Sequence, residues 1–318
     1  MDDLRADLHA LNRRSPILPV KAIPVRITAD LTAEDAFRAT LSDCLAQMTA
    51  NAGSLRGGRS VEGLHQLRVG FRRLEVALGA FGMEFQLDWL EELRGRGKVL
   101  SSRLAAARDL DVFVCDLLNA PGAAATGGER DSFAALRARA ERARNAAWEE
   151  AAECVAGADF AMFLDDVAGL AQSRLPLGRQ QKLPKLAARL LDRAARRVKK
   201  RGRTAQSREE RDLHHLRIAL KKLRYTAEFF ASLCPKKKSR RYLEKVRLLQ
   251  EHLGALNDIA HARATVGQLM RADKTKGDAD ARFAAGAVTG WYGAKSQRIV
   301  KQALKRYRKF RAIKPFWD

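Results

Sequence analysis

The chain has 318 residues, of which 46% are hydrophobic and 31% are charged, proportions that are ordinary for a globular protein. Sixty lysines and arginines against 37 aspartates and glutamates leave a net charge of +23, which favours a polyanionic partner such as nucleic acid, an anionic membrane surface or a phosphate polymer. No apolar run is long enough to span a bilayer, so we expect no membrane span.

The first segment, residues 1–28, is expected to be an extended arm. Pro16, Pro19 and Pro24 are each unsuited to a helix interior, and charged residues stand where a secretory signal needs an apolar run. The cysteines are widely spaced and form no C-x-x-C pair, so we expect reduced thiols in the core of a cytoplasmic protein. The cysteines are Cys44, Cys115, Cys154 and Cys234.

Beyond the arm, apolar residues recur three and four positions apart, which is the period of amphipathic helices. Breaks that contain glycine or proline separate these segments at residues 51–60, 119–128, 173–184 and 272–280. About eight long helices with short connections follow from this pattern. The sequence therefore predicts an all-α protein built from helical bundles.

One helical segment is written twice. Residues 65–81 read HQLRVGFRRLEVALGAF, and residues 214–230 read HHLRIALKKLRYTAEFF, at an offset of 149 positions. The register continues without a gap as far as Asp109 and Asp258, which are also 149 apart. An offset that holds over this length predicts two homologous halves, 29–170 and 183–313, joined by a linker at 171–182.

Each copy combines an apolar stripe with a basic row on another face, as the helical period of about 100° per residue requires. One basic row is usually a solvated face, but a repeated arrangement of His, Arg and Arg or Lys points to a bound anion. The rows comprise His65, Arg68 and Arg72 in the first copy, and His214, Arg217, Lys221 and Arg224 in the second, and Arg73 and Lys222 flank them.

Two other predicted helices carry similar basic columns beside apolar ones. Like charges four residues apart repel by a few tenths of a kcal/mol, roughly, so several parallel columns suggest that an anion lies on them. The columns are Arg189, Arg193, Arg196 and Lys200 in one helix, and Arg298, Lys301, Lys305 and Arg308 in the other.

The pattern H-x-L-R-[VI]-x-x-[RK]-[RK]-L, at 65–74 and 214–223, resembles the CHAD domain, the conserved histidine α-helical domain. Two further stretches, LSSRLAAARDLDVFV at 100–114 and LLQEHLGALNDIAHA at 248–262, support the resemblance, which covers nearly all of the chain except the arm. It implies two four-helix bundles related by pseudo-twofold symmetry, with a basic cavity between them that binds inorganic polyphosphate.

Carried over by position, the resemblance implies that both basic rows and the flanking Arg73 and Lys222 bind polyphosphate, together with Lys98 and Arg247 on the third helix of each half. Glu75 departs from the pattern, since Arg224 occupies the equivalent position of the second copy. Either the first half binds less tightly there, or Glu75 pairs with a neighbouring arginine. Acidic residues on the first helix also favour a site with more of its charge in the second half.

The two repeated histidines have a reference pKa near 6.5, so a bound polyanion would favour their charged forms. We expect affinity to rise as the pH falls toward 6, although either His65 or His214 could instead brace a neighbouring helix while neutral. The other histidines match no position in both copies and are interpreted as structural.

The predicted function is non-catalytic binding of polyphosphate, without a cofactor or a metal. The chain contains no P-loop, no H-E-x-x-H and no metal-ligand spacing, and Asp109 and Asp258 are interpreted as partners of basic side chains. The main alternative is a nucleic-acid-binding protein, although no recognised motif of that class is present. An enzyme of polyphosphate metabolism, and a scaffold on polyphosphate or polyhydroxyalkanoate granules, are further alternatives.

Overall fold

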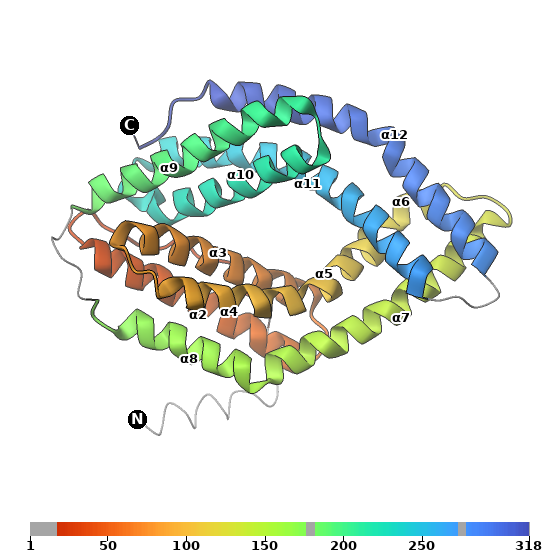
Figure 1. Ribbon diagram of the computed structural model, residues 1–318, viewed down its shortest axis with the longest axis horizontal. Coiled ribbons are helices and arrows are strands. Elements are labelled where there is room, and N and C mark those ends of the chain that lie inside the picture. Colours follow the sequence, from red (N-terminus) through yellow and green to blue (C-terminus); the bar gives the residue numbers. More distant parts are fainter. Residues whose placement is uncertain (1–17, 176–181, 273–277, 318) are drawn as a thin grey trace. The chain divides into compact units, whose positions relative to one another are not determined.

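The computed structural model describes residues 18–175, 182–272 and 278–317. Within these ranges the regular structure is helical and no strand is present, apart from an isolated bridge between Thr32 and Lys182 (Figure 1). The prediction of an all-α fold is confirmed. The first seventeen residues of the expected arm lie outside the described residues.

The chain forms two compact units, each built on long helices. Of the described residues, the first unit comprises 18–23, 37–108 and 148–175, and the second comprises 24–36, 109–147, 182–272 and 278–317. The first unit contains most of α2 (Ala33–Arg56), together with α3 (Val61–Phe85), α4 (Leu90–Arg103) and α8 (Ala158–Gln172). The second contains α9 (Leu183–Thr204), α10 (Glu210–Phe230), α11 (Lys236–Ala272) and α12 (Asp278–Arg311).

Shorter elements complete the fold, and in the second unit the long helices pack in pairs. α10 lies beside α9, and α11 runs along α12 (Figure 1). Between α4 and α8 the chain forms α5 (Ala105–Val112), a π-helical turn η1 (Phe113–Leu117), α6 (Asn119–Ala123) and α7 (Glu129–Ala156). Single 3₁₀ turns, η2 (Ala205–Ser207) and η3 (Ala231–Leu233), follow α9 and α10.

The helix bounds agree with the repeat read from the sequence. α10 begins at Glu210, 149 positions after Val61 begins α3, and α9 begins at Leu183, 150 positions after Ala33 begins α2. The helix pairs therefore start at nearly the same offset as the two sequence motifs. The division into halves at 29–170 and 183–313 stays a prediction.

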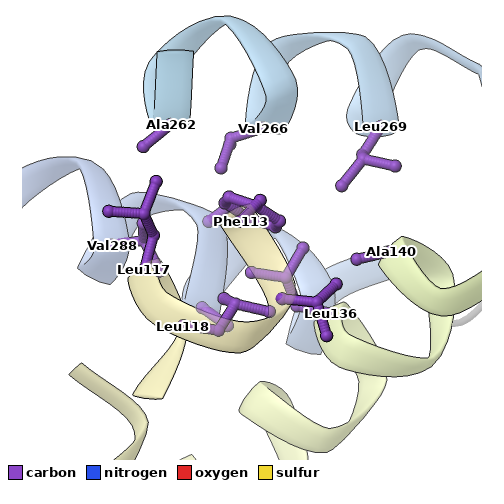
Figure 2. Packing of buried hydrophobic residues seen from close by; sticks show 12 residues of the cluster. Phe113, Leu117, Leu118, Leu136, Ala140, Ala262, Val266, Leu269 and Val288 are labelled. Carbon is purple, nitrogen blue, oxygen red and sulfur yellow. The ribbon is translucent and has the colours of Figure 1, made fainter. Parts of the chain in front are cut away.

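Residues 109–147 pack within the second unit, although the sequence repeat assigns them to the first half. Figure 2 shows the reason, a cluster of buried apolar side chains that includes Phe113 of η1, Val266 of α11 and Val288 of α12. Leu136 of α7 belongs to the same cluster. The Tyr292 hydroxyl also donates a hydrogen bond to the Leu117 carbonyl at 2.9 Å. Burial of these side chains holds η1 and the first part of α7 against α11 and α12.

The predicted breaks are partly correct. α8 ends at Gln172 and α9 begins at Leu183, as expected, whereas α2 continues to Arg56 through the first part of the break at 51–60. Asn51 is buried there, and its amide donates to the carbonyls of Gln47 and Val20 at 2.7 and 2.8 Å. These bonds satisfy a polar side chain that the sequence suggested would lie in a loop. The short helix α6 likewise occupies part of 119–128.

The cysteine prediction is correct for two of the four thiols. Cys44 and Cys154 are buried, Cys234 is partly buried, and Cys115 is exposed on η1. All four are free. Burial raises the pKa of Cys44 to about 12, so this thiol stays protonated at neutral pH.

Gly202 allows α9 to approach α12 closely, and its replacement by alanine should destabilise the protein. A Cβ atom at this position would lie 1.9 Å from Cζ of Tyr307, whose ring is buried and whose hydroxyl donates to the Lys199 carbonyl at 3.3 Å. We expect Gly202→Ala to lower the free energy of unfolding by about 1–3 kcal/mol in urea denaturation. Gly254→Ala is the control, because a Cβ there meets no atom within 4 Å and should stabilise α11 by about 0.5–1 kcal/mol. Equal stability of the two variants would contradict this account.

Candidate anion-binding site

A basic pocket of about 230 Å³ lies between α3 and α4 in the first unit. Arg68 and Arg72 line it from α3, and Arg94 and Lys98 line it from α4. Each pair is spaced four residues apart, so its side chains occupy one face of their helix, and the two faces meet. The structure thus brings together three residues predicted from the sequence, Arg68, Arg72 and Lys98, and adds Arg94.

Only some of these cations are held by partners in the protein. Arg68 donates to the Ser101 carbonyl at 2.7 Å, and Arg94 pairs with Glu91 at 2.7 Å and with Glu75 at 3.3 Å. Glu75 therefore pairs with a neighbouring arginine, which is one of the two alternatives that the sequence left open. Arg72 Nε is buried and donates no hydrogen bond within the part of the chain that the structure describes.

Arg73 is a correction to the predicted site. Its side chain is only 2% exposed, and its guanidinium donates to Asp43 at 2.5 Å and to Gln47 at 2.7 Å. Because the guanidinium of Arg73 already donates to two side chains of α2, it links α3 to α2 and is not available to a ligand. The helical period alone placed it beside the basic row.

A second basic pocket, of about 520 Å³, lies in the second unit among α10, α11 and α12. His214 and Arg217 line it, as the sequence predicted. Three arginines that the sequence did not single out join them: Arg208 before α10, Arg211 on α10 and Arg263 on α11. Arg217 is the positional equivalent of Arg68, so each copy of the motif contributes this arginine to a pocket of its own unit.

The surroundings of His214 in the second pocket disfavour its charged form. Burial lowers the pKa of His214 first and the charge of Arg217 lowers it further, against a hydrogen bond from Asn257 that raises it. Burial also raises the pKa of Asp258, although Arg217 and His261 act in the opposite direction. His261 also has an acidic partner, since the carboxylate of Asp109 lies 3.4 Å from its Nδ1.

Other predicted site residues lie elsewhere. His65, Lys221 and Lys222 are partly buried and line neither of these two pockets. The four-residue columns of α9 and α12 are exposed and also line neither pocket. These columns are Arg189, Arg193, Arg196 and Lys200, and Arg298, Lys301, Lys305 and Arg308.

Arg224 and Arg247 line a separate pocket of about 660 Å³ where α10 meets α11. Arg224 lies 3.6 Å from Glu228. Arg247 is 51% exposed and pairs with Glu244 at 2.8 Å and with Glu251. Both arginines therefore already have carboxylate partners within the protein.

The missed residues differ in how far the sequence could have revealed them. Arg94 stands four residues before Lys98, and Arg211 stands three residues before His214, so extension of the basic rows by one turn would have included both. Arg263 has no such signal. It reaches the pocket only because α11 packs against α10.

No cluster of three or more His, Cys, Asp or Glu side chains is arranged to hold a metal ion among the described residues. In the same part of the chain, no helix has the length and apolarity that a membrane span needs.

The helical fold, with a basic pocket in each unit that is lined by the arginine of a repeated H-x-L-R motif, defines the class of this protein. The family model of the CHAD domain matches residues 39–267, and the chain belongs to this family. The crystal structure of the CHAD domain from the plant Ricinus communis is similar, with 24% identity, a TM-score of 0.83, and coverage of 93% of this chain and 98% of that one.

A second solved structure, PptA from Streptomyces chartreusis, has 20% identity and a TM-score of 0.66, with 88% of this chain and 99% of that chain covered. At these identities the two structures support the fold. No curated protein sequence matches this chain significantly.

The lowered pKa of His214 predicts a pH dependence of anion binding. Because this pKa lies below its ordinary value of 6.5, the charged imidazole is disfavoured near neutral pH, and a polyanion bound beside it would favour uptake of a proton as the pH falls. We expect polyphosphate affinity to rise as the pH falls below about 6.5. Titrations at fixed ionic strength between pH 7.5 and 5.5 measure this rise, which should be smaller in His214→Asn. An equal rise in both proteins would contradict the assignment.

Proposed function

We propose that this protein binds inorganic polyphosphate and catalyses no reaction on it. The observation that carries the proposal is the equivalence of Arg68 and Arg217, which line one basic pocket in each unit. Arg72 and Lys98 accompany Arg68, and Arg211 accompanies Arg217. Membership of the CHAD family supports the same ligand class.

The side chains of the two pockets suit phosphate oxygens. Arginine donates in a planar fork and lysine acts as a point charge, and charge-assisted hydrogen bonds are the stronger class. A polyphosphate chain presents repeated anionic oxygens that can accept from each cation in turn. Binding should release counterions and weaken steeply as salt increases, as it does for nucleic acids.

We propose further that one polymer engages both halves, in the basic cavity that the family resemblance implies. Attachment at one site raises the effective concentration of the chain at the second, so affinity should grow with chain length. Titration calorimetry with tripolyphosphate and with long-chain polyphosphate tests this point. Equal affinity per phosphate for both lengths would favour two independent sites.

Competition tests the proposal against nucleic-acid binding, its main alternative. The protein is loaded with labelled long-chain polyphosphate at physiological salt, and unlabelled polyphosphate or duplex DNA is added at equal phosphate concentration. We expect polyphosphate to displace the label and DNA to leave most of it bound. Displacement by DNA at the same concentration would overturn the preference for polyphosphate.

Incubation with polyphosphate and Mg²⁺ separates binding from chemistry. We expect no released phosphate and no change in chain length on a gel. Release or elongation would identify an enzyme of polyphosphate metabolism instead.

A cytoplasmic location at polyphosphate granules is part of the proposal, because a protein with affinity for the polymer collects where the polymer is dense. A fluorescent fusion should coincide with stained polyphosphate granules and disperse when the polymer is depleted. If the fusion instead stays on polyhydroxyalkanoate granules after polyphosphate is depleted, the protein would be assigned to those granules.

A further inference from the structure

The second-unit pocket contains an apolar wall that an inorganic phosphate chain cannot use. Leu213, Leu253 and Ile259 form part of this wall, and each is at most 5% exposed. Leu256, Ala260 and Val300 extend it. At about 520 Å³ the pocket is within the usual range for sites of small organic ligands, whereas the first-unit pocket, at about 230 Å³, is smaller.

The same pocket is strongly cationic at its polar side. Arg208, Arg211, Arg217 and Arg263 face a single carboxylate, Glu210, among its lining residues. Arg208, Arg211 and Arg263 form no ion pair with any residue in the described ranges. Their charges are therefore available to an anion, and the apolar wall lies beside them.

Arg208 occupies a conformation that disfavours its own side chain. It closes the turn between η2 and α10 with φ 66° and ψ 8°, in the left-handed region that glycine prefers. Strain of this kind at a non-glycine residue is found preferentially at ligand sites. A glycine would satisfy the turn, but it would not place a cation at the pocket.

We propose that this pocket binds a phosphate monoester that carries an apolar organic group. The phosphate lies among Arg208, Arg211 and Arg263, and the organic group packs against the leucine and isoleucine wall. This inference goes beyond polyphosphate binding, although the two ligands share Arg217. Polyphosphate should therefore compete with the monoester for the second unit.

A homologous series of alkyl phosphates tests the apolar wall. Calorimetric titrations with inorganic, butyl, hexyl and octyl phosphate are run at fixed salt and below the concentration at which octyl phosphate forms micelles. We expect affinity to rise about three- to fourfold per methylene, the effect of burying one CH₂ group. Hexanol at the same concentration should bind weakly, because it lacks the anion. An affinity independent of chain length would overturn the proposal.

The variant Leu256→Asn should flatten the dependence on chain length while inorganic phosphate binds as before. A slope equal to that of the wild type would show that the alkyl chains bind elsewhere, and would also overturn the proposal. Polyphosphate binding is measured on the same proteins. A chain that binds octyl phosphate and ignores polyphosphate would disprove the proposed function alone, and the reverse result would disprove this inference alone.

The variant Arg208→Gly tests the cationic side without a loss of folding. We expect its thermal stability to equal or exceed that of the wild type, since glycine relieves the turn, while affinity for hexyl phosphate falls about tenfold. Gln86→Gly is the matched control, because Gln86 ends α3 with φ 58° and lies outside the pocket. It should gain stability without a change in binding. Unchanged binding in Arg208→Gly would contradict the proposed role of this arginine.

Discussion

The Arg73→Ala variant is expected to lose about 3–5 kcal/mol of unfolding free energy, which is the usual result of removing one partner of a buried ion pair. Asp43, only 21% exposed, would keep its charge without the guanidinium that now lies 2.5 Å away. Gln47 would lose its donor as well. Typical domains are stable by about 5–15 kcal/mol, so such a loss should be plain in urea denaturation followed by circular dichroism.

Arg72→Ala is the matched control for this prediction. It removes the neighbouring cation of the same helix, whose side chain is partly exposed and whose Nε lacks a partner among the described residues. We expect its stability to change by less than about 1 kcal/mol, and its polyphosphate affinity to fall. A similar loss of stability in both variants would show that Arg73 has no special structural role.

Replacement of four motif cations with alanine is expected to reduce polyphosphate affinity about a thousandfold or more, since a hydrogen bond to a charged group contributes about 1.5–3 kcal/mol. Contributions at one site are not additive, so the single variants should not sum to the effect of the set. The fold should persist with a modest loss, because all four side chains are partly exposed, although Arg68 gives up its hydrogen bond to the Ser101 carbonyl. Affinity is measured by titration with long-chain polyphosphate. The set is Arg68, Arg72, Arg217 and Lys221.

A second four-residue variant separates the site from the net charge. It removes four exposed cations that belong to neither motif nor to the predicted columns, so its net charge falls by the same amount. We expect it to lose affinity only a few-fold, through weaker long-range attraction. Equal losses in the two variants would show that total charge, and not the paired motifs, determines binding. The control set is Arg103, Lys185, Arg197 and Lys309.

Periodicity and the repeated motif predicted most of the fold and part of the site. The helical class and the cations Arg68, Arg72 and Arg217 at pockets follow from spacing within single helices. The near-equal starts of the paired helices agree with the repeat, and the resemblance implied Lys98. Spacing is sufficient here because residues three and four apart share a helix face whatever the helix packs against.

The roles of adjacent cations could not be predicted in this way. Arg72 and Arg73 are consecutive in the sequence, yet Arg72 lines a pocket while Arg73 is enclosed by Asp43 and Gln47 of α2. The angular step between neighbours on a helix is large enough to give them different environments. Which environment is the core depends on the helices that pack alongside.

The sequence by itself determined that this is a helical, strongly basic CHAD-family chain with the same basic H-x-L-R motif written twice. The tertiary structure decided which cations gather into pockets, since Arg263 joins Arg217 only through the packing of α11 on α10. It also decided that residues 109–147 pack with the second unit. Local periodicity sets which face of a helix is polar, but burial against distant segments sets what that face meets.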